Sequence, residues 1–195
     1  MKYQPNILWY TVAVGKSMLE LQQRLQPSFV QVLTAEMLGL EKDSDPLRIF
    51  QSRCRLPEFF DISKYDAIVQ LEADVSFNTP VAVPLDRITV ERGDNTFAYY
   101  LADYPYLIPP VGPMTWQGFL SIPGGVAVQF FDQWRENYKQ IGNKPFEELI
   151  TYETLKPFKW SFRNDIAFYP QEAAIIHYRG LAAKRSVYPD FSDNF

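Results

Sequence analysis

Ile7-Leu-Trp-Tyr-Thr-Val-Ala-Val14 is an almost continuous apolar run near the start of the chain. A strand that is apolar on both faces is typical of a parallel sheet covered on both sides. Gly15 ends this run, and Met18, Leu21 and Leu25 then follow at helical spacing. A buried strand that leads directly into an amphipathic helix predicts the opening β-α unit of an α/β fold.

The rest of the chain continues this alternation. Apolar runs predict strands over 29–33, 65–71 and 173–178, and alternating residues predict a hairpin over 87–91 and 96–101. Helices are predicted after Gly15, from Ser44-Asp-Pro46, from Gly124-Gly125 and near Pro145. The proline-rich segment 104–116 is predicted to be a loop. Because no repeat or long linker divides the chain, we expect one α/β domain over 1–195, with a mixed, mainly parallel sheet flanked by helices.

Composition excludes several classes of protein. The 195 residues are 47% apolar and 16% aromatic, which is the opposite of the balance that keeps a chain disordered. A net charge of −4, without a block of Lys and Arg, argues against binding to a nucleic-acid backbone. A single cysteine excludes an internal disulfide, and no apolar run is long enough to span a bilayer. We therefore expect a soluble intracellular protein in which Cys54 and the aromatic helix from Phe130 to Tyr138 pack in the core.

Two acidic residues follow the strand over 65–71, in the sequence Leu71-Glu72-Ala73-Asp74. The only histidine, His177, ends another predicted strand, and Arg179, Lys184 and Arg185 come after it. In open α/β sheets the carboxyl ends of strands gather the ligand-binding loops. Two carboxylates and an imidazole at such an edge can hold a divalent cation, while basic side chains hold phosphate oxygens.

Each of these features also has a simpler interpretation. Glu72 and Asp74 can cap a turn as solvated carboxylates, and a lone histidine after Ile-Ile is often a core or edge residue. The basic residues Arg179, Lys184 and Arg185 can form a solvated tail. The order in which the three features occur favours the metal and phosphate interpretation. A P-loop is excluded because Tyr10 occupies the position of the first glycine before Gly15-Lys16-Ser17.

The order of these motifs resembles the layout of GT-A fold glycosyltransferases. The motifs are a strand followed by Leu71-Glu72-Ala73-Asp74, a Gly-Gly before an aromatic helix, and His177-Tyr-Arg-Gly180 with Lys184 after it. The nearest pattern is that of the glycogenin-like family eight, which has Asp-x-Asp and His-x-x-Gly-x-x-Lys motifs. The resemblance spans most of the chain, from Ile7 to Lys184. In length the chain resembles compact glycosyltransferases of some bacteria and large DNA viruses.

The resemblance implies a role for each matching residue. The Asp-x-Asp-like carboxylates and the histidine imply Mn²⁺ or Mg²⁺ bound by three residues, which here are Glu72, Asp74 and His177. By the same resemblance, residues at the end of the first strand would contact the nucleotide base, and the glycine and lysine of the last motif would contact the diphosphate. A basic residue upstream of the carboxylates would also reach the donor. These contacts fall on Thr11, Val12, Ala13, Gly180, Lys184 and either Arg55 or Arg53. Residues 1–80 would then be the nucleotide-binding half and residues 81–195 the half that closes the acceptor and metal site.

The expected activity is transfer of a hexose or pentose from a nucleotide-diphosphate donor, with UDP favoured, to a hydroxyl of a glycan, a protein or a small molecule. Asp74 is expected to be essential for catalysis. An inverting enzyme needs an acceptor base, for which Glu147, Glu148 and Asp165 are candidates because they are acidic residues of the second half, whereas a retaining enzyme needs none. Two alternatives stay open: a non-enzymatic binding or assembly domain, and a nucleotidyltransferase or metal phosphohydrolase.

Overall fold

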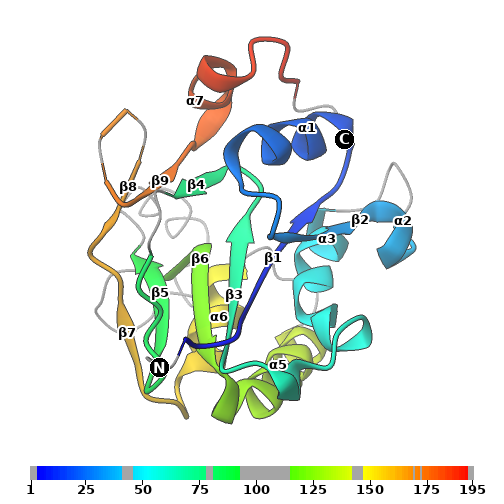
Figure 1. Cartoon of the computed structure of the whole chain (residues 1–195). Helices are drawn as coiled ribbons and strands as arrows, with labels where there is room; N and C mark the ends of the chain where they lie inside the picture. Colours follow the sequence, from blue (N-terminus) through cyan, green and yellow to red (C-terminus); the bar gives the residue numbers. More distant parts are fainter. Residues whose placement is uncertain are drawn as a thin grey trace, which may run out of the picture.

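The computed structural model describes residues 4–40, 46–77, 81–92, 115–141, 147–168, 170–171 and 173–192. They form an α/β fold with two sheets (Figure 1). The larger sheet has six strands in the order β2 (Gln31–Thr34), β1 (Ile7–Ala13), β3 (Ala67–Glu72), β6 (Thr115–Pro123), β5 (Ile88–Arg92) and β7 (Trp160–Phe162). The smaller sheet has the order β4 (Val75–Phe77), β9 (Ile175–His177) and β8 (Ile166–Phe168).

The larger sheet is mixed, with β6 running against the other strands. The pairs β1–β2, β1–β3 and β5–β7 are parallel, whereas β6 is antiparallel to both β3 and β5. The prediction of a mixed, mainly parallel sheet is therefore confirmed. Because β3 pairs with β6, strands from before and after residue 80 belong to one sheet.

The described helices are α1 (Lys16–Leu25), α2 (Ala35–Leu38), α3 (Pro46–Ser52), α5 (Gly124–Ile141), α6 (Glu147–Leu155) and α7 (Gly180–Val187), with the short 3-10 helices η1 (Arg53–Glu58) and η2 (Ile62–Lys64). Helices α1, α3, α5 and α6 lie where the sequence predicted helices, whereas α2, α7 and the two short 3-10 helices were not predicted. Pro46 begins α3 as a proline at the first helical position, where its missing N–H breaks no helical hydrogen bond. Within the described residues, no helix is long and apolar enough to cross a membrane.

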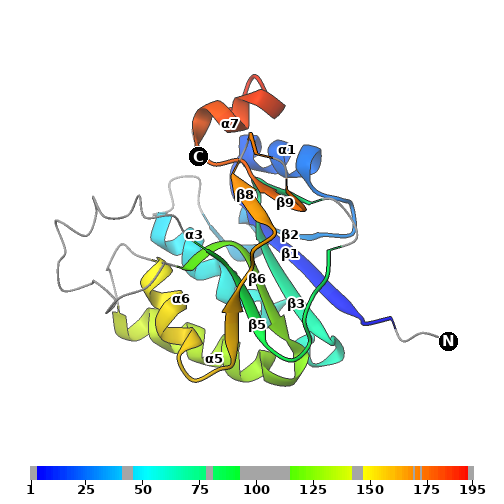
Figure 2. The same ribbon diagram turned by 90° about the vertical axis from the view of Figure 1, so that its left-hand side faces the viewer.

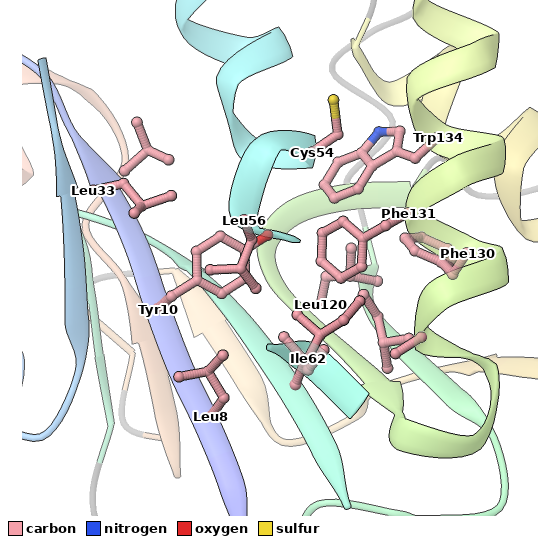
Figure 3. Packing of buried hydrophobic residues seen from close by; sticks show 14 of the residues in the cluster. Leu8, Tyr10, Leu33, Cys54, Leu56, Ile62, Leu120, Phe130, Phe131 and Trp134 are labelled. Carbon is pink, nitrogen blue, oxygen red and sulfur yellow. The ribbon is translucent and has the colours of Figure 1, made fainter. Parts of the chain in front are cut away.

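The main core lies between the larger sheet and the layer formed by α5, η1 and η2 (Figure 3). Phe130, Phe131 and Trp134 of α5 are fully buried and face side chains of β1 such as Tyr10. Each large side chain removed from water in this way contributes about 1.5–3 kcal/mol. Cys54 also packs in this core, so both the aromatic helix and the cysteine lie where the sequence predicted.

A second apolar cluster fills the space between the opposite face of the larger sheet and the smaller sheet. Val69 and Leu71 of β3 pack there with Val75 and Phe77 of β4 and with Ile175 of β9. In Figure 2 the smaller sheet lies beside the upper end of the larger one, close to α1 and α7. This packing brings β9 to the carboxyl end of β3.

One predicted element is only partly described. The strand over 87–91 is present as β5, which pairs with β6 along 89–92 and with β7 along 88–90. Its predicted hairpin partner, 96–101, lies outside the described residues, and so does nearly all of the predicted loop over 104–116, whose last residues belong to β6.

The turn from β6 into α5 depends on a close backbone contact at Gly124. Its N–H donates to the carbonyl oxygen of Asp66 at 2.7 Å, and a Cβ added at Gly124 would lie 2.0 Å from the carbonyl oxygen of Tyr65. A Cβ added at the neighbouring Gly125 meets no atom within 4 Å. The two glycines therefore offer a matched pair.

We expect Gly124→Ala to lower the free energy of unfolding by about 1–3 kcal/mol, because the backbone must move away from Tyr65. We expect Gly125→Ala to raise it by about 0.5–1 kcal/mol, since alanine is the better helix former. Urea denaturation followed by circular dichroism measures both values. Equal effects of the two substitutions would contradict this account of the turn.

Candidate metal and nucleotide site

The site forms where β3 ends and the chain turns into β4. Glu72 is the last residue of β3, and Asp74 lies in the turn that follows it. Strand β9 pairs antiparallel with β4, which sets His177 opposite Val75. The backbone N–H of Tyr178 donates to the carbonyl oxygen of Asp74 at 2.8 Å and ties the two strand ends together. Residues more than 100 positions apart are thus brought to one edge of the sheet.

The two carboxylates and the imidazole converge on one point. His177 Nε2 lies 3.1 Å from an oxygen of Glu72 and 3.4 Å from an oxygen of Asp74. One ligand atom from each of the three residues lies within 4.8 Å of the others. The imidazole is almost fully buried, whereas Glu72 keeps about a quarter of its side chain exposed. The group is therefore open on the Glu72 side.

Two cations neutralise these carboxylates. Arg53 donates from Nη2 to the second oxygen of Glu72 at 2.7 Å, and Lys184 Nζ lies 3.1 Å from the second oxygen of Asp74. Arg53 begins η1, while Lys184 lies on α7 one helical turn after Gly180. Each carboxylate therefore faces His177 with one oxygen and a basic side chain with the other.

A cavity of about 230 Å³ opens beside this group. Its polar end is formed by Arg53, Glu72, Asp74 and Lys184. The remaining wall is largely apolar and is formed by Val12, Val14, Ser17, Met18, Ile49, Phe50, Ala73, Phe191 and Ser192. An apolar wall with a charged end suits a ligand that has a flat ring at one end and phosphates at the other.

A further carboxylate, Glu91 of β5, was not among the residues singled out in the sequence. Its oxygen lies 3.0 Å from Nδ1 of His177, and the residue is 1% exposed. In the sequence Glu91 is one polar position in an alternating strand, which is typical of a solvent-facing side chain. The structure differs because the register between β5 and β6 shifts between Val90 and Glu91, opposite Gly118. The absence of a side chain at Gly118 was the one signal of close packing there.

The charges shift the titration of these groups. Burial alone lowers the pKa of His177, but Asp74, Glu72 and Glu91 outweigh burial and raise it well above 6.5. Burial alone raises the pKa of Glu72, but Arg53 and His177 outweigh it and hold this pKa below its usual range. Burial raises the pKa of Glu91. The neighbouring carboxylates thus favour the charged form of the imidazole, and Arg53 and the imidazole favour the ionised form of Glu72.

The donor set fits a hard or borderline divalent cation such as Mn²⁺ or Mg²⁺. Two carboxylates and one imidazole are ligands that Mn²⁺ accepts, and the first two suit Mg²⁺. Oδ1 of Asp74 is buried and has no hydrogen-bond partner among the described residues, although it faces Nε2 of His177. A buried carboxylate oxygen without a donor is the kind of atom that a bound cation would satisfy.

The predicted base-contacting residues lie at the end of β1, next to β3. Val12 lines the cavity. Thr11 and Ala13 are buried but are not among the residues of the cavity wall. Their side chains alternate with those of Val12 and Val14 along the strand and so point to the opposite face.

The sequence left open whether Arg53 or Arg55 reaches the donor, and the structure places the two side chains differently. Arg53 reaches the cavity, whereas Arg55 donates to both oxygens of Glu58 and to the carbonyl oxygen of Leu38. The two side chains differ because residues two apart in a helical turn point in different directions. Arg55 is therefore not brought to the candidate site.

The remaining predicted residues lie at varying distances from the cavity. Gly180 begins α7 with a φ of 80°, which favours glycine, but it does not line the cavity. Asp165 pairs with Arg163 at 2.7 and 2.5 Å and lines a different cavity beside β5 and β7. This hydrogen bonding lowers the pKa of Asp165, which weakens it as a base. The backbone of Glu148 lies in α6, and its side chain is outside the described part of the chain.

The raised pKa of His177 makes a prediction about stability. A folded state that binds a proton more tightly than the unfolded chain loses stability as the pH rises through the folded-state pKa. The contribution of His177 is therefore complete below about pH 6.5 and falls above it. Glu72 has the opposite effect: because its pKa is lowered in the folded state, its contribution to stability is lost as the pH falls, at lower pH than the effect of His177.

We expect the metal-free protein to lose stability as the pH rises above about 6.5 and the variant His177→Asn to lose less over the same range. Urea denaturation at several pH values measures this slope. Since His177 is the only histidine, no other imidazole contributes. An unchanged slope in the variant would contradict the assignment.

Comparison with known proteins agrees with this architecture. No family model and no curated protein matches the sequence. Among solved structures, a glycosyltransferase involved in glycosylating the major capsid of PBCV-1 superimposes with a TM-score of 0.65 at 10% identity, over 94% of this chain and 98% of that chain. The bifunctional glycosyltransferase WbbM gives 0.56 at 8% identity, over 93% of this chain and 47% of its own.

The galactosyltransferase LgtC, solved with donor and acceptor sugar analogues, gives a TM-score of 0.53 at 12% identity, over 89% of this chain and 87% of that chain. At such identities the likeness shows the fold alone. The chain has the GT-A fold of these glycosyltransferases, which confirms the fold that the sequence predicted.

Proposed function

We propose that this protein is a metal-dependent glycosyltransferase that moves a sugar from a nucleoside-diphosphate donor, with UDP favoured, to a hydroxyl acceptor. The observation that carries the proposal is the convergence of Glu72, Asp74 and His177 within 4.8 Å, beside a cavity that Glu72 and Asp74 line. Similar folds that are glycosyltransferases support the same class of reaction.

The cavity supplies what such a donor requires. The apolar part of its wall suits the face of a nucleotide base, and Val12 and Phe50 belong to this part. The polar end holds Arg53 and Lys184, whose charges suit two linked phosphates. The group of Glu72, Asp74 and His177 lies between the side chains of Arg53 and Lys184. A diphosphate bound there would contact both the metal ion and the two basic side chains.

When bound, a divalent cation would neutralise charge on the departing diphosphate. Glu72, Asp74 and His177 would hold it, each with an atom that faces the other two. Arg53 and Lys184 would then turn from the carboxylates to phosphate oxygens. Lys184 of α7 and, after this helix, Phe191 and Ser192 form part of the cavity wall.

This exchange of partners links the two ligands. In the unliganded site Lys184 and Arg53 compete with a cation for the carboxylates, while the carboxylates compete with phosphate for the two basic side chains. When cation and diphosphate bind together, neither group is left with an unpaired charge. Binding of the two ligands should therefore be cooperative.

The proposed acceptor is a hydroxyl group, and the proposed sugar is a hexose or a pentose. Glu148 stays a prediction as an acceptor base, whereas the hydrogen bonds that Arg163 donates weaken Asp165 as a base.

We expect Asp74→Asn to abolish metal-dependent release of free nucleoside diphosphate from a panel of nucleotide sugars. The amide cannot supply the negative oxygen that the cation needs. Asp86→Asn is the matched control, because Asp86 forms ion pairs only at the surface, with Arg87 and Lys159. Thermal melting checks that both variants fold; turnover by a folded Asp74→Asn variant at the wild-type rate would refute the assignment.

We expect Lys184→Ala to have opposite effects on the two ligands. Mn²⁺ alone should bind more tightly, because Asp74 no longer has an ammonium partner, whereas UDP in the presence of Mn²⁺ should bind roughly tenfold more weakly. Isothermal titration calorimetry measures both affinities. Lys156→Ala is the control, because Lys156 pairs with Glu153 on α6. A change of the same sign for both ligands would contradict the proposed exchange.

A further inference from the structure

Glu91 is a buried carboxylate that the proposed reaction does not use directly. It is 1% exposed and lies on β5, away from the cavity wall. Its Oε1 lies 3.0 Å from Nδ1 of His177, and its Oε2 has no hydrogen-bond partner among the described residues. Burying a carboxylate costs free energy unless the group is paired and hydrogen-bonded, and His177 is the partner that the structure gives it.

The sheet is shaped to admit this contact. A Cβ added at Gly118 of β6 would lie 2.1 Å from Oε2 of Glu91 and 2.6 Å from Nδ1 of His177. No real Cβ approaches other atoms so closely, so the absence of a side chain at Gly118 makes room for both groups. The register shift between Val90 and Glu91 falls at the same place. Three strands, β5, β6 and β9, therefore cooperate in a single side-chain contact.

The two nitrogens of His177 consequently face different partners. Nδ1 faces Glu91, while Nε2 faces Glu72 and Asp74. When a cation occupies Nε2, the ring carries its proton on Nδ1, where the carboxylate of Glu91 can accept it. The lone pair of Nε2 then points to the region that the oxygens of Glu72 and Asp74 also face.

We propose that Glu91 is a positioning residue, which accepts the Nδ1 proton of His177 in a hydrogen bond and so holds Nε2 ready to bind a divalent cation with Glu72 and Asp74. The inference rests on the proposed metal site. Hydrogen-bonded carboxylates behind a metal-binding histidine generally fix the tautomer and the orientation of the ring. In this role Glu91 touches neither donor nor acceptor.

The wild-type protein allows a direct test. Because the chain has one histidine, nitrogen-15 NMR of the side-chain imidazole reports His177 alone. With a diamagnetic divalent cation such as Zn²⁺ bound, we expect the proton on Nδ1 and the cation on Nε2. A cation bound to Nδ1, or an imidazole that does not bind the cation at all, would overturn the inference.

Variants test the consequence for affinity. We expect Glu91→Leu to weaken binding of Mn²⁺ alone by about 10- to 100-fold and to lose the fixed Nδ1 tautomer. Glu91→Gln, whose amide oxygen still accepts the Nδ1 proton, should keep the tautomer and recover part of the affinity. Mn²⁺ affinity is measured by electron paramagnetic resonance of the free ion, and melting temperatures show whether each variant folds.

Thr89→Val is the matched control, since Thr89 is a buried residue of the same strand whose hydroxyl bonds Ser121 at 2.6 Å and not His177. It should lower stability without changing the tautomer or the affinity for Mn²⁺. Gly118→Ala provides an independent variant, because it leaves Glu91 and His177 in the chain but removes the space between them. We expect it to weaken Mn²⁺ binding as Glu91→Leu does.

The outcomes separate this inference from the proposed function. If the wild-type protein fails to bind Mn²⁺ with or without UDP, the proposed function itself fails. If the wild-type protein binds Mn²⁺ and a folded Glu91→Leu variant binds it equally well with the same tautomer, the positioning role of Glu91 alone is wrong.

Discussion

The site depends on the contacts that the imidazole of His177 makes with three carboxylates. His177 belongs to β9 of the smaller sheet, yet its two nitrogens contact Glu72 at the end of β3 and Glu91 on β5 of the larger sheet. The same ring faces Asp74 in the turn between the sheets. One side chain thus ties both sheets together at the edge where ligands bind in α/β proteins. If the ring turned or withdrew, three buried or half-buried carboxylates would face one another without a cation between them.

Charge balance explains why so many ionised groups are stable together. Glu72 is paired with Arg53 and Asp74 with Lys184, and the imidazole lies between the two pairs. Such an arrangement contributes little net stability, since the desolvation of each ion offsets the attraction between them. Its physical consequence is that each pair can be exchanged for a ligand of matching charge. In the proposed reaction a cation would replace the basic side chains as partner of the carboxylates, and a diphosphate would replace the carboxylates as partner of the basic side chains.

Sequence patterns predicted the parts of this arrangement that depend on local chemistry. Continuous apolar runs placed β1 and β3, and the acidic residues directly after β3 marked the ligand edge. Three features depended on packing and were out of reach. The geometry of η1 decides that Arg53 and not Arg55 faces the cavity. A register shift beside Gly118 buries Glu91, which by alternation alone is a surface residue. Helix α7 begins at Gly180, which places Lys184 one helical turn later. The ammonium group of Lys184 therefore reaches Asp74, although Lys184 lies one residue later than the spacing His-x-x-Gly-x-x-Lys requires.

The central claim is that Glu72, Asp74 and His177 together hold a divalent cation beside a nucleoside diphosphate. The most direct measurement is the anomalous scattering of manganese in crystals grown with Mn²⁺ and UDP. The account predicts one strong manganese peak within bonding distance of an oxygen of Asp74, an oxygen of Glu72 and Nε2 of His177, with the UDP phosphates on its open side. A manganese peak bound elsewhere, or UDP ordered in the cavity with no manganese at these three residues, would contradict it.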